Sequence, residues 1–592
     1  MLKLPYGIAD FQALIRDGYV YIDRTSHIHD LESLGRYLLF VRPRRFGKSL
    51  WLQTLAAYYD FRTEAAHEEL FGDLAIGREP TPNAHRYFVL KWDFSDVTSS
   101  GSVGEIATSL NSYINTTFEI FLSDYADDLP AVTLRDDAKH SLLAVLAAVR
   151  RTGRSLYLLI DEYDNFANQL MARDQGTYSS LVHGVGPYRD LMKTVKSATQ
   201  GQGLERIFAT GISPIVMSDL SSGMNILISV YQNRELNGLC GFKDDEIREL
   251  LESIQSQDEN PSQWTLEETQ ATIRDWYNGY RFSPDVRERV YNPTMALYFL
   301  DHLQRYREPP RLLLDDNLAA DEDKLRFVAQ VGAGEQALLE VLQKDEPIKI
   351  PSLAGRFTLS DMLERSSYDR TFLASFLTYF GMLTLAREDG RGNLELEPPN
   401  MVVRQLYIAQ VLQFLLPRGE DRSMAWTQAK AFLEDGDIAP LLSFVEDKLF
   451  PVMSNRDYVF MNEQSLKMLL LTLLWNESTH QVLSELELTR GYADLCLLRR
   501  PDRRLTDADD FLFEIKYAKL SELDLVGAEL REMDRNALEG LPQVQVLLAE
   551  AEEQLQRYRD SLQERHGETL RLRAFAVVGL GFERLLAREL VD

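Results

Sequence analysis

The chain reads YLLFVRPRRFGKS over residues 37–49. The first five letters form an apolar run that is typical of a buried strand, and residues 49–59 have the pattern of an amphipathic helix. Gly47, Lys48 and Ser49 therefore stand between a strand and a helix, which is the context that a phosphate-binding loop requires. Because Gly-Lys-Ser alone arises often by chance, the interpretation needs support from elsewhere in the chain.

The chemistry of such a loop assigns a role to each polar residue. Backbone amides of the loop and of the new helix face phosphate oxygens. Lys48 would reach the β- and γ-phosphates, and the Ser49 hydroxyl would bind Mg²⁺. The general pattern begins with glycine, whereas this chain has Arg42 in that place, so hydrolysis has less support than binding. The loop residues expected to contact a nucleotide are Arg44, Arg45, Phe46, Gly47, Lys48 and Ser49.

A second apolar run, LYLLIDE over residues 156–162, ends in two acids. In a P-loop ATPase, Asp161 would hold Mg²⁺ and Glu162 would polarise the attacking water. The competing interpretation is that both acids begin a solvated loop. A Gly-Lys-Ser loop about 110 residues upstream favours the nucleotide site.

Two further strand ends carry candidate polar residues. Thr210 ends the run over residues 206–209, where a sensor of the γ-phosphate usually sits, although a hydroxyl capping the turn at Gly211 is about as well supported. Asp93 follows another strand and fits a solvated strand end at least as well as a site.

Apolar runs at residues 37–41, 87–92, 156–160 and 206–209 alternate with helical patterns, which predicts an α/β fold with a parallel sheet. From about residue 241 helices dominate, and residues 370–385 read as a helix leading into a strand, a winged-helix rhythm. Strand patterns return near the C-terminus. We therefore predict three domains, namely a P-loop domain over 1–240, a helical and winged-helix region over 241–420, and a C-terminal α/β domain over 421–592.

The composition excludes several classes. Of 592 residues, 45% are hydrophobic and 26% charged, which rules out a wholly disordered chain. Two cysteines exclude a disulfide framework and a cysteine-rich zinc module. We find no signal peptide and no apolar run that could span a membrane, so we expect a cytoplasmic protein. The net charge of −27 means that any contact with nucleic acid must come from local basic patches.

The stretch FLFEIKY over residues 511–517 alternates, so Glu514 and Lys516 share one face of a strand. Asp494 lies on an earlier strand run, and the two acids can converge on Mg²⁺. Lys516 would then orient or deprotonate the attacking water. An isolated Glu-x-Lys is more often an exposed cross-strand salt bridge, which is the competing interpretation.

Two more acids are candidates for this site. Glu463 begins an amphipathic helix and could supply a third carboxylate, and Glu487 on the preceding strand is a weaker alternative. A basic tip between the strands could meet phosphates, with a solvated loop as an equally supported alternative; it comprises Arg499, Arg500, Arg503 and Arg504.

The first part of the chain resembles the bacterial AAA-ATPase-like family over roughly residues 4–300. The segments that carry the resemblance are residues 4–11, 21–25, 42–49, 160–164, 210–214, 276–282 and 291–293. The resemblance implies that Arg42 is a family trait. The aromatic cluster Trp276–Phe282 would be a lid or packing element, and an aromatic core is its better interpretation from the residues alone.

Roughly residues 440–585 resemble the PD-(D/E)XK phosphodiesterase superfamily, in the order of helix acid, hairpin, Asp strand and Glu-x-Lys strand. The later Gln…Tyr motif of that superfamily is matched by Gln554 and Tyr558, four apart on one helical face. The chain departs from the pattern by lacking an arginine before Asp494 and by a charged insertion over residues 499–510.

Together these features predict a protein that binds ATP with Mg²⁺ and carries a Mg²⁺-dependent nuclease domain acting on DNA. The alternative is a regulatory or scaffold protein that binds a nucleotide and a partner without cutting, which the acidic charge favours. A homo-oligomer is possible, since many ATPases of this kind complete their sites between subunits. No arginine finger can be picked out from the sequence.

Overall fold

The computed structural model describes residues 1–165, 175–182, 186–220, 224–256, 264–314, 325, 334–343, 347–355, 369–454, 462–475, 479–488, 491–500, 508–567 and 570–590. Contacts divide the chain into two compact units. The first unit comprises residues 1–261, 270–307 and 348–400, and the second comprises residues 262–269, 308–347 and 401–592.

The first unit is built on a parallel five-stranded sheet in the order β2-β3-β4-β1-β5. Its strands are β1 (Tyr37–Val41), β2 (Tyr87–Asp93), β3 (Ser155–Asp161), β4 (Leu204–Gly211) and β5 (Ile228–Ser229). The predicted parallel sheet is confirmed, and four of its strands match the apolar runs. The pattern did not predict β5, because two exposed residues carry no periodicity.

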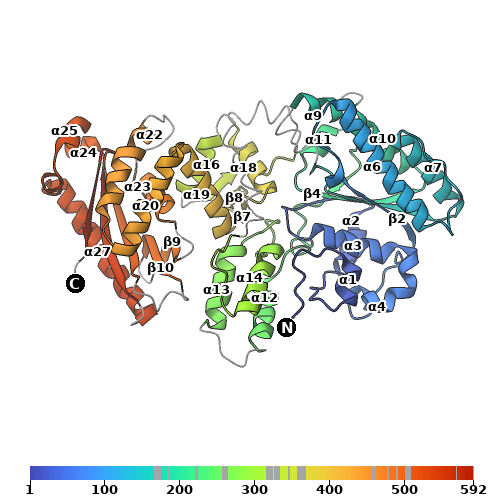
Figure 1. Ribbon diagram of the computed structural model, residues 1–592, viewed down its shortest axis with the longest axis horizontal. Helices are drawn as coiled ribbons and strands as arrows, with labels where there is room; N and C mark the ends of the chain where they lie inside the picture. Colours follow the sequence, from blue (N-terminus) through green and yellow to red (C-terminus); the bar gives the residue numbers. More distant parts are fainter. Residues whose placement is uncertain are drawn as a thin grey trace. The chain divides into compact units, whose positions relative to one another are not determined.

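Helices cover both faces of this sheet (Figure 1). On one face lies α3 (Lys48–Tyr59), which contacts β2 and β3. On the other lie α6 (Val103–Asp124) and α7 (Ala138–Arg151). With both faces covered, the strands are buried along most of their length, which explains why they read as continuous apolar runs. The remaining helices of this part are α1 (Phe11–Arg16), α2 (His27–Leu34), α4 (His67–Phe71), α5 (Ala75–Arg78), α9 (Gln175–Val182), α10 (Pro187–Ala198) and α11 (Ile215–Leu220), with 3₁₀ turns η1 (Phe61–Ala66) and η2 (Phe94–Asp96).

Three helices follow the sheet in the sequence, namely α12 (Asp244–Gln255), α13 (Leu266–Tyr277) and α14 (Pro293–Tyr306). A small antiparallel sheet with the order β6-β8-β7 belongs to the first unit. Its strands are β6 (Ile348–Ile350), β7 (Thr384–Glu388) and β8 (Leu394–Glu397), and α18 (Arg370–Tyr379) precedes β7. The predicted helix followed by a strand over residues 370–385 is therefore confirmed, while the winged-helix assignment stays a prediction.

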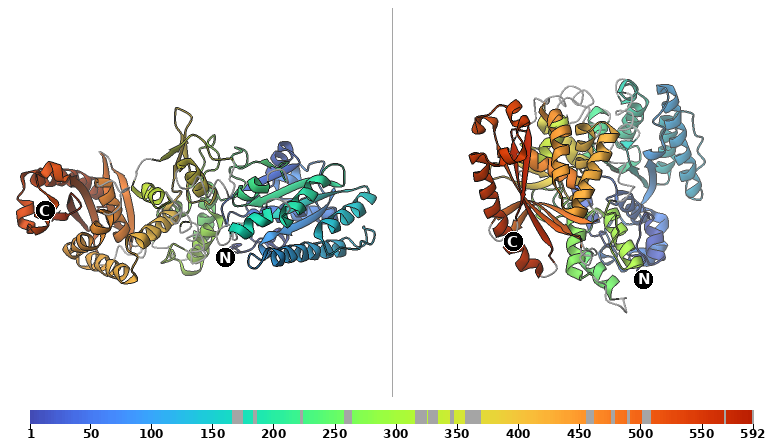
Figure 2. Two further views of the ribbon diagram at one scale, coloured as in Figure 1. Left: turned by 90° about the horizontal axis from the view of Figure 1, so that it is seen from above. Right: turned by 60° about the vertical axis from the view of Figure 1, so that its left-hand side comes forward.

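The second unit contains a five-stranded sheet in the order β13-β12-β11-β10-β9. Only β11 and β12 pair in parallel. The strands are β9 (His480–Leu488), β10 (Gly491–Arg499), β11 (Asp510–Ala518), β12 (Leu572–Leu580) and β13 (Arg584–Glu589). The long helix α27 (Pro542–His566) leads into β12 and packs on both β11 and β12 (Figure 2). The helix α23 (Glu463–Leu474) also contacts β11.

Alternation along β11 decides which residues face α27. Leu512 belongs to the same buried cluster as Val544, Leu548 and Leu555 of α27, so the even-numbered positions of β11 point to that helix. The other helices of the unit are α16 (Gly334–Gln343), α19 (Met401–Leu415), α20 (Gly419–Asp435), α21 (Ala439–Phe444), α22 (Phe450–Ser454), α24 (Leu520–Leu523), α25 (Gly527–Glu532) and α26 (Arg535–Glu539), with a π-helical turn over Val445–Leu449.

The predicted domain ranges, 1–240, 241–420 and 421–592, stay predictions, because compact units group residues by contact and do not test where a domain begins. A membrane-crossing helix needs about 20 apolar residues. Among the helices described above, none reaches that length with enough apolar character.

Candidate nucleotide-binding site and candidate acidic site

The phosphate loop joins β1 to α3 at the carboxyl edge of the parallel sheet, where open α/β sheets bind ligands. Gly47 forms the N-cap of α3 with φ of 85°, and Arg45 has φ of 65°. These left-handed residues turn the loop sharply, so that the backbone can enclose an anion. The helix begins at Lys48, one residue earlier than predicted.

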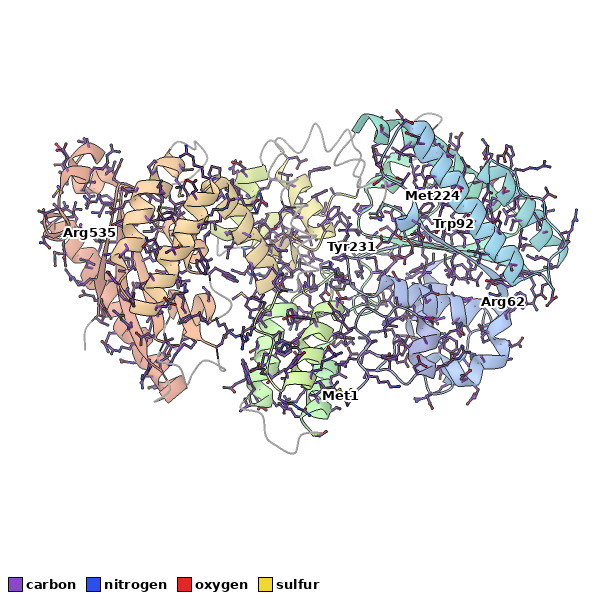
Figure 3. All side chains as sticks on the ribbon, in the orientation of Figure 1. Met1, Arg62, Trp92, Met224, Tyr231 and Arg535 are labelled. Atoms are coloured by element: carbon purple, nitrogen blue, oxygen red, sulfur yellow. The ribbon has the colours of Figure 1, made fainter. Side chains whose placement is uncertain are left out.

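Arg42 is a structural residue of the loop. Its side chain is fully buried and donates hydrogen bonds to the carbonyl oxygens of Val41 (2.9 Å), Tyr231 (3.0 Å) and Leu236 (2.9 Å). The guanidinium also lies 4.1 Å from the ring centre of Phe282. Tyr231 is labelled in Figure 3. Arg42 thus ties the start of the loop to residues 231–236, which accounts for an arginine where other loops have glycine.

The lysine, the serine and the first acid of the predicted site lie together. Lys48 Nζ donates to the carbonyl oxygen of Pro43 at 2.9 Å. The Ser49 hydroxyl lies near the carboxyl of Asp161. Burial lowers the pKa of Lys48, while Asp161 opposes that shift. Burial raises the pKa of the Asp161 carboxyl, and the nearby Ser49 hydroxyl opposes the rise. A Ser–Asp pair beside a lysine is the arrangement in which P-loop proteins hold Mg²⁺.

Glu162 and Thr210 stand next to this pair. Glu162 has φ of 46°, a strained conformation for a non-glycine residue, and burial raises the pKa of its carboxyl. The amide of Tyr163 donates to the Thr210 carbonyl at 3.3 Å, which joins the ends of β3 and β4. Thr210 is fully buried, and its hydroxyl has no hydrogen-bond partner among the described residues. The hydroxyl therefore does not cap the turn, and its role as a γ-phosphate sensor stays a prediction.

Asp164 was not predicted as a site residue, yet it fixes this edge. Its carboxylate accepts hydrogen bonds from the amides of Ile212 (3.2 Å) and Ser213 (2.9 Å). A Cβ atom on Gly211 would approach Asp164 Oδ1 to 2.3 Å, so only glycine fits there. Asp93, in contrast, is exposed and accepts from the Ser95 amide at 3.0 Å, as expected of a solvated strand end.

A cavity of about 300 Å³ adjoins the phosphate loop. Four parts of the chain line it besides the loop and α3: the N-terminal segment, Glu162 after β3, the residues before α12, and the start of α14. The lining includes Pro5, Gly7, Ile8, Ala9, Tyr21, Ile22, Arg24, Arg45, Lys48, Ser49, Trp51, Glu162, Cys240, Phe242, Thr294 and Leu297. The sequence marked residues 4–11 and 21–25 only by resemblance, because no polar motif in them points to a ligand.

Three lining residues carry buried donors that lack a partner within the part of the chain that the structure describes. They are Arg24 Nε, Arg45 Nη1 and Trp51 Nε1. A buried donor without an acceptor costs about 1–3 kcal/mol. A ligand rich in acceptor oxygens and nitrogens, such as a nucleotide, would relieve that cost.

The aromatic cluster over Trp276–Phe282 packs on the loop. The ring of Phe46 meets Tyr280 and Phe282 edge-on, with centroid distances of 4.8 and 5.4 Å. All three rings are buried. The interpretation as a packing element is confirmed. The Phe46 side chain anchors the loop, and the contact of Phe46 with a nucleotide stays a prediction.

In the second unit, β10 and β11 bring three predicted residues together. Asp494 Oδ2 accepts from the backbone amide of Ile515 at 2.8 Å, and Lys516 Nζ donates to Glu514 Oε1 at 2.8 Å. The backbone pairing of β10 with β11 ends at Leu495. One residue before that point, the side chain of Asp494 provides the hydrogen bond to β11. Glu514 and Lys516 face α27, on the same side of the sheet as Leu512.

Glu514 is the acid of this site whose pKa is shifted most. Burial, and next the charge of Asp494, raise its pKa to about 7. Burial alone would lower the pKa of Lys516, but its bond to Glu514 and the nearby acids raise it. Glu514 Oε2 is buried and lacks a hydrogen-bond partner in the described parts of the chain. An orphaned carboxylate oxygen beside a second acid fits a hard cation, which prefers oxygen ligands.

Glu463 is the third carboxylate that the sequence predicted for this site. Burial raises the pKa of Glu463, and Lys516 opposes that rise, so the two lie within electrostatic reach. The described residues contain no group of three His, Cys, Asp or Glu side chains that could hold one metal ion, so they do not place Glu463 as a third ligand, and its assignment stays a prediction. Lys467, which the sequence reasoning missed, is buried one turn later with Nζ 4.0 Å from Asp494 Oδ1.

From α27, Tyr558 is near the acids. Burial raises its pKa and the charge of Glu514 adds to the rise. Gln554, one turn earlier, has a buried side-chain oxygen without a partner inside the described ranges. The side chain of Glu487 lies outside the described residues.

The predicted basic tip is wrong for two of its residues. Arg499 is buried against Asp510 at 2.9 Å, and Arg500 donates to the carbonyls of Pro310 and Arg311. Burial of their guanidinium groups keeps both from meeting phosphates. Arg503 and Arg504 lie outside the described residues.

Comparison with known proteins finds a family match over the region that contains the phosphate loop. Residues 5–221 match the model of a family described as predicted AAA-ATPase. This match covers the loop, both acids and Thr210, and ends before α12. The N-terminal region is therefore AAA-ATPase-like.

Among curated proteins, the chain is similar to an uncharacterized protein in the vnfD 5′ region of Azotobacter chroococcum mcd 1, with 29% identity over 295 residues. The match covers 49% of this chain, which spans half the length of that relative. Among solved structures, similarity extends to the ORC2 protein of Aeropyrum pernix in ADPNP–ADP complexes and to Cdc6p of Pyrobaculum aerophilum. Both show 12% identity and a TM-score of 0.26, covering 67% and 68% of this chain and 98% and 97% of theirs.

Proposed function

We propose that the first unit binds ATP with Mg²⁺ in the cavity beside the phosphate loop and hydrolyses it. The observation that carries the proposal is the proximity of Lys48, Ser49 and Asp161 at the phosphate loop. The family match over residues 5–221 supports the same conclusion.

Each residue of the site would have a separate role. Lys48 would leave the Pro43 carbonyl to meet the β- and γ-phosphates, since a charged oxygen is the stronger acceptor. Ser49 and Asp161 would hold Mg²⁺, whose chemistry is to neutralise charge on the phosphate oxygens. Glu162 would orient the attacking water and accept its proton, and the raised pKa of its carboxyl makes it a stronger base than an ordinary glutamate.

Glu162→Gln is expected to keep nucleotide binding and to lose hydrolysis by about 10²-fold or more, because the amide keeps the shape of the side chain but cannot accept a proton. ATP affinity by calorimetry and phosphate release by a coupled assay measure the two properties. Lost binding, or retained turnover, would contradict the assigned role of Glu162.

We further propose that the second unit is a metal-dependent phosphodiesterase of the PD-(D/E)XK type that cuts DNA. The observation that favours it is the orphaned oxygen of Glu514 beside Asp494 and Lys516. Asp494 and Glu514 would hold Mg²⁺, which supplies a Lewis acid for phosphodiester hydrolysis. Lys516 would hold the nucleophilic water.

The alternative is a nucleotide-binding regulator or scaffold whose second unit binds a partner without cleavage. The net charge of −27 and the burial of Arg499 and Arg500 favour it. Cleavage assays on single- and double-stranded DNA and RNA, with Mg²⁺ and with or without ATP, separate the two. Cleavage that depends on Mg²⁺ supports the nuclease, and its absence on every polymer supports the regulator.

The pH dependence of stability tests the proposed metal site by a measurement that does not require enzymatic activity. The pKa of Glu514 is raised from 4.5 to about 7, so across this range the folded state keeps a proton that the unfolded state has lost. Stability without metal should therefore fall as pH rises from about 4.5 to about 7. Above pH 7, added Mg²⁺ should raise the melting temperature by several degrees, because a cation offsets the buried charge.

Glu514→Gln removes the buried charge, so its melting temperature should depend less on both pH and Mg²⁺. The matched control is Glu434→Gln on α20, where the carboxylate is 63% exposed and pairs with Lys430. Scanning calorimetry of the full chain at pH 6 and 8 measures both effects. An equal response of the wild type and Glu514→Gln to Mg²⁺ would refute a metal site at Glu514.

A further inference from the structure

Three consecutive carbonyl oxygens of the phosphate loop each accept a hydrogen bond from a side chain. Lys48 Nζ donates to Pro43 O at 2.9 Å. The other two donors come from the start of α14, almost 250 residues later in the sequence. Asn292 Nδ2 donates to Arg44 O at 3.4 Å, and Thr294 Oγ1 donates to Arg45 O at 3.2 Å.

The fold fixes the orientation of Asn292. It is the N-cap of α14, and its side-chain oxygen accepts from the amides of Thr294 (3.1 Å) and Met295 (3.4 Å). Its own backbone amide donates to Tyr277 O at 3.1 Å, and the residue is only 2% exposed. Because the oxygen serves the cap, the NH₂ group is left to point at Arg44 O.

Holding these carbonyls has a direct consequence for an anion. A peptide carbonyl and the amide of the same peptide unit point in opposite directions, so carbonyls drawn toward α14 turn amides toward the opposite side. The left-handed φ angles of Arg45 (65°) and Gly47 (85°) are those of a loop whose amides converge on an anion. α14 therefore stabilises the shape of the loop that a phosphate requires.

We propose that Asn292 and Thr294 are positioning residues of the nucleotide site, which make phosphate affinity depend on the docking of α14 against the loop. The inference rests on the proposed nucleotide binding. By linkage, a bound nucleotide stabilises the docked helix to the same extent as the helix strengthens binding. Nucleotide binding at the loop would therefore stabilise the start of α14 against the loop.

The test compares paired substitutions in the full chain. Thr294→Val removes the hydroxyl at constant shape, and Thr294→Ser restores it. Asn292→Asp keeps the oxygen that caps α14 but removes the donor to Arg44 O. The matched control is Thr199→Val, since the Thr199 hydroxyl also donates to a backbone carbonyl, that of Lys196 at 2.7 Å, and is likewise half-buried.

Loss of one hydrogen bond to the loop should weaken ATP binding about 3- to 10-fold in Thr294→Val and in Asn292→Asp. Thr294→Ser and Thr199→Val should bind like the wild type. Pyrophosphate affinity should fall in parallel, because the effect acts through the phosphate loop. Hydrogen exchange at the first turn of α14 should slow on nucleotide addition in the wild type and less in Thr294→Val.

Each outcome has a separate meaning. A wild type that binds no ATP overturns the proposed function itself. If the wild type binds and Thr294→Val binds equally well, the positioning role alone is wrong. Equal weakening in Thr294→Ser and Thr294→Val, or weakening toward adenosine with unchanged pyrophosphate binding, shows a packing or direct-contact role and also overturns the inference.

Discussion

Lys48→Ala should abolish nucleotide binding, with a loss of affinity of at least about 100-fold. The ammonium group is the cation of the loop, it is buried, and a charge-assisted bond to phosphate in such a place is stronger than one at the surface. Truncation would also leave the Pro43 carbonyl without its bond from Lys48. Calorimetric titration of ATP and ADP in the presence of Mg²⁺ measures the effect.

The matched control is Lys139→Ala. Lys139 pairs with Asp137 on the surface at the start of α7 and is 37% exposed, so its loss should change neither affinity nor fold. Circular dichroism of both variants checks that the overall secondary structure is unchanged. Equal ATP affinity in the wild type and Lys48→Ala would show that the cavity binds no nucleotide through this loop.

Asp494→Ala, Glu514→Ala and Lys516→Ala should each reduce DNA cleavage by about 10³-fold or more, because a metal ligand or the group beside the water is lost from a site that acts as a unit. ATP affinity should stay unchanged, since the three residues lie in the second unit and the nucleotide cavity lies in the first. Gel assays of cleavage at saturating Mg²⁺, with parallel ATP titrations, measure both.

Lys430→Ala serves as the control for Lys516→Ala, because Lys430 lies half-exposed on α20 and pairs with the exposed Glu434. Glu514→Gln is a further comparison, since it keeps the volume of the side chain without its charge. Cleavage that survives both Glu514→Ala and Asp494→Ala would refute the proposed mechanism. A loss of ATP binding in the same variants would instead point to coupling between the units.

Local sequence pattern determined the parallel sheet and the loop. Strands buried on both faces must be apolar throughout, so β1 and β3 could be recognised from composition alone. Polar residues end these strands, with Gly-Lys-Ser after β1 and Asp-Glu at the end of β3. They identified Lys48, Ser49 and Asp161 as candidate site residues, and the structure places these three near one another. Spacing of two along β11 likewise placed Glu514 and Lys516 on one face.

Tertiary structure decided what a one-dimensional pattern does not encode. The Arg42 guanidinium is directed to the carbonyls of Tyr231 and Leu236, about 190 residues away in the sequence, so its departure from the glycine pattern became intelligible only in the fold. The cavity wall from residues 5–9 has no polar signature, because apolar and backbone atoms form it.

The sequence by itself determined the parallel sheet, the phosphate loop, and the positions of Glu514 and Lys516 on one face of β11. These features depend on neighbours within a few positions. The burial of Arg499 and Arg500, the missing partner of Glu514 Oε2 among the described residues, and the bonds from Asn292 and Thr294 to the loop depend on atoms far away in the sequence. Hydrogen bonding and desolvation at such contacts are set by three-dimensional proximity, and for that reason only the tertiary structure decided them.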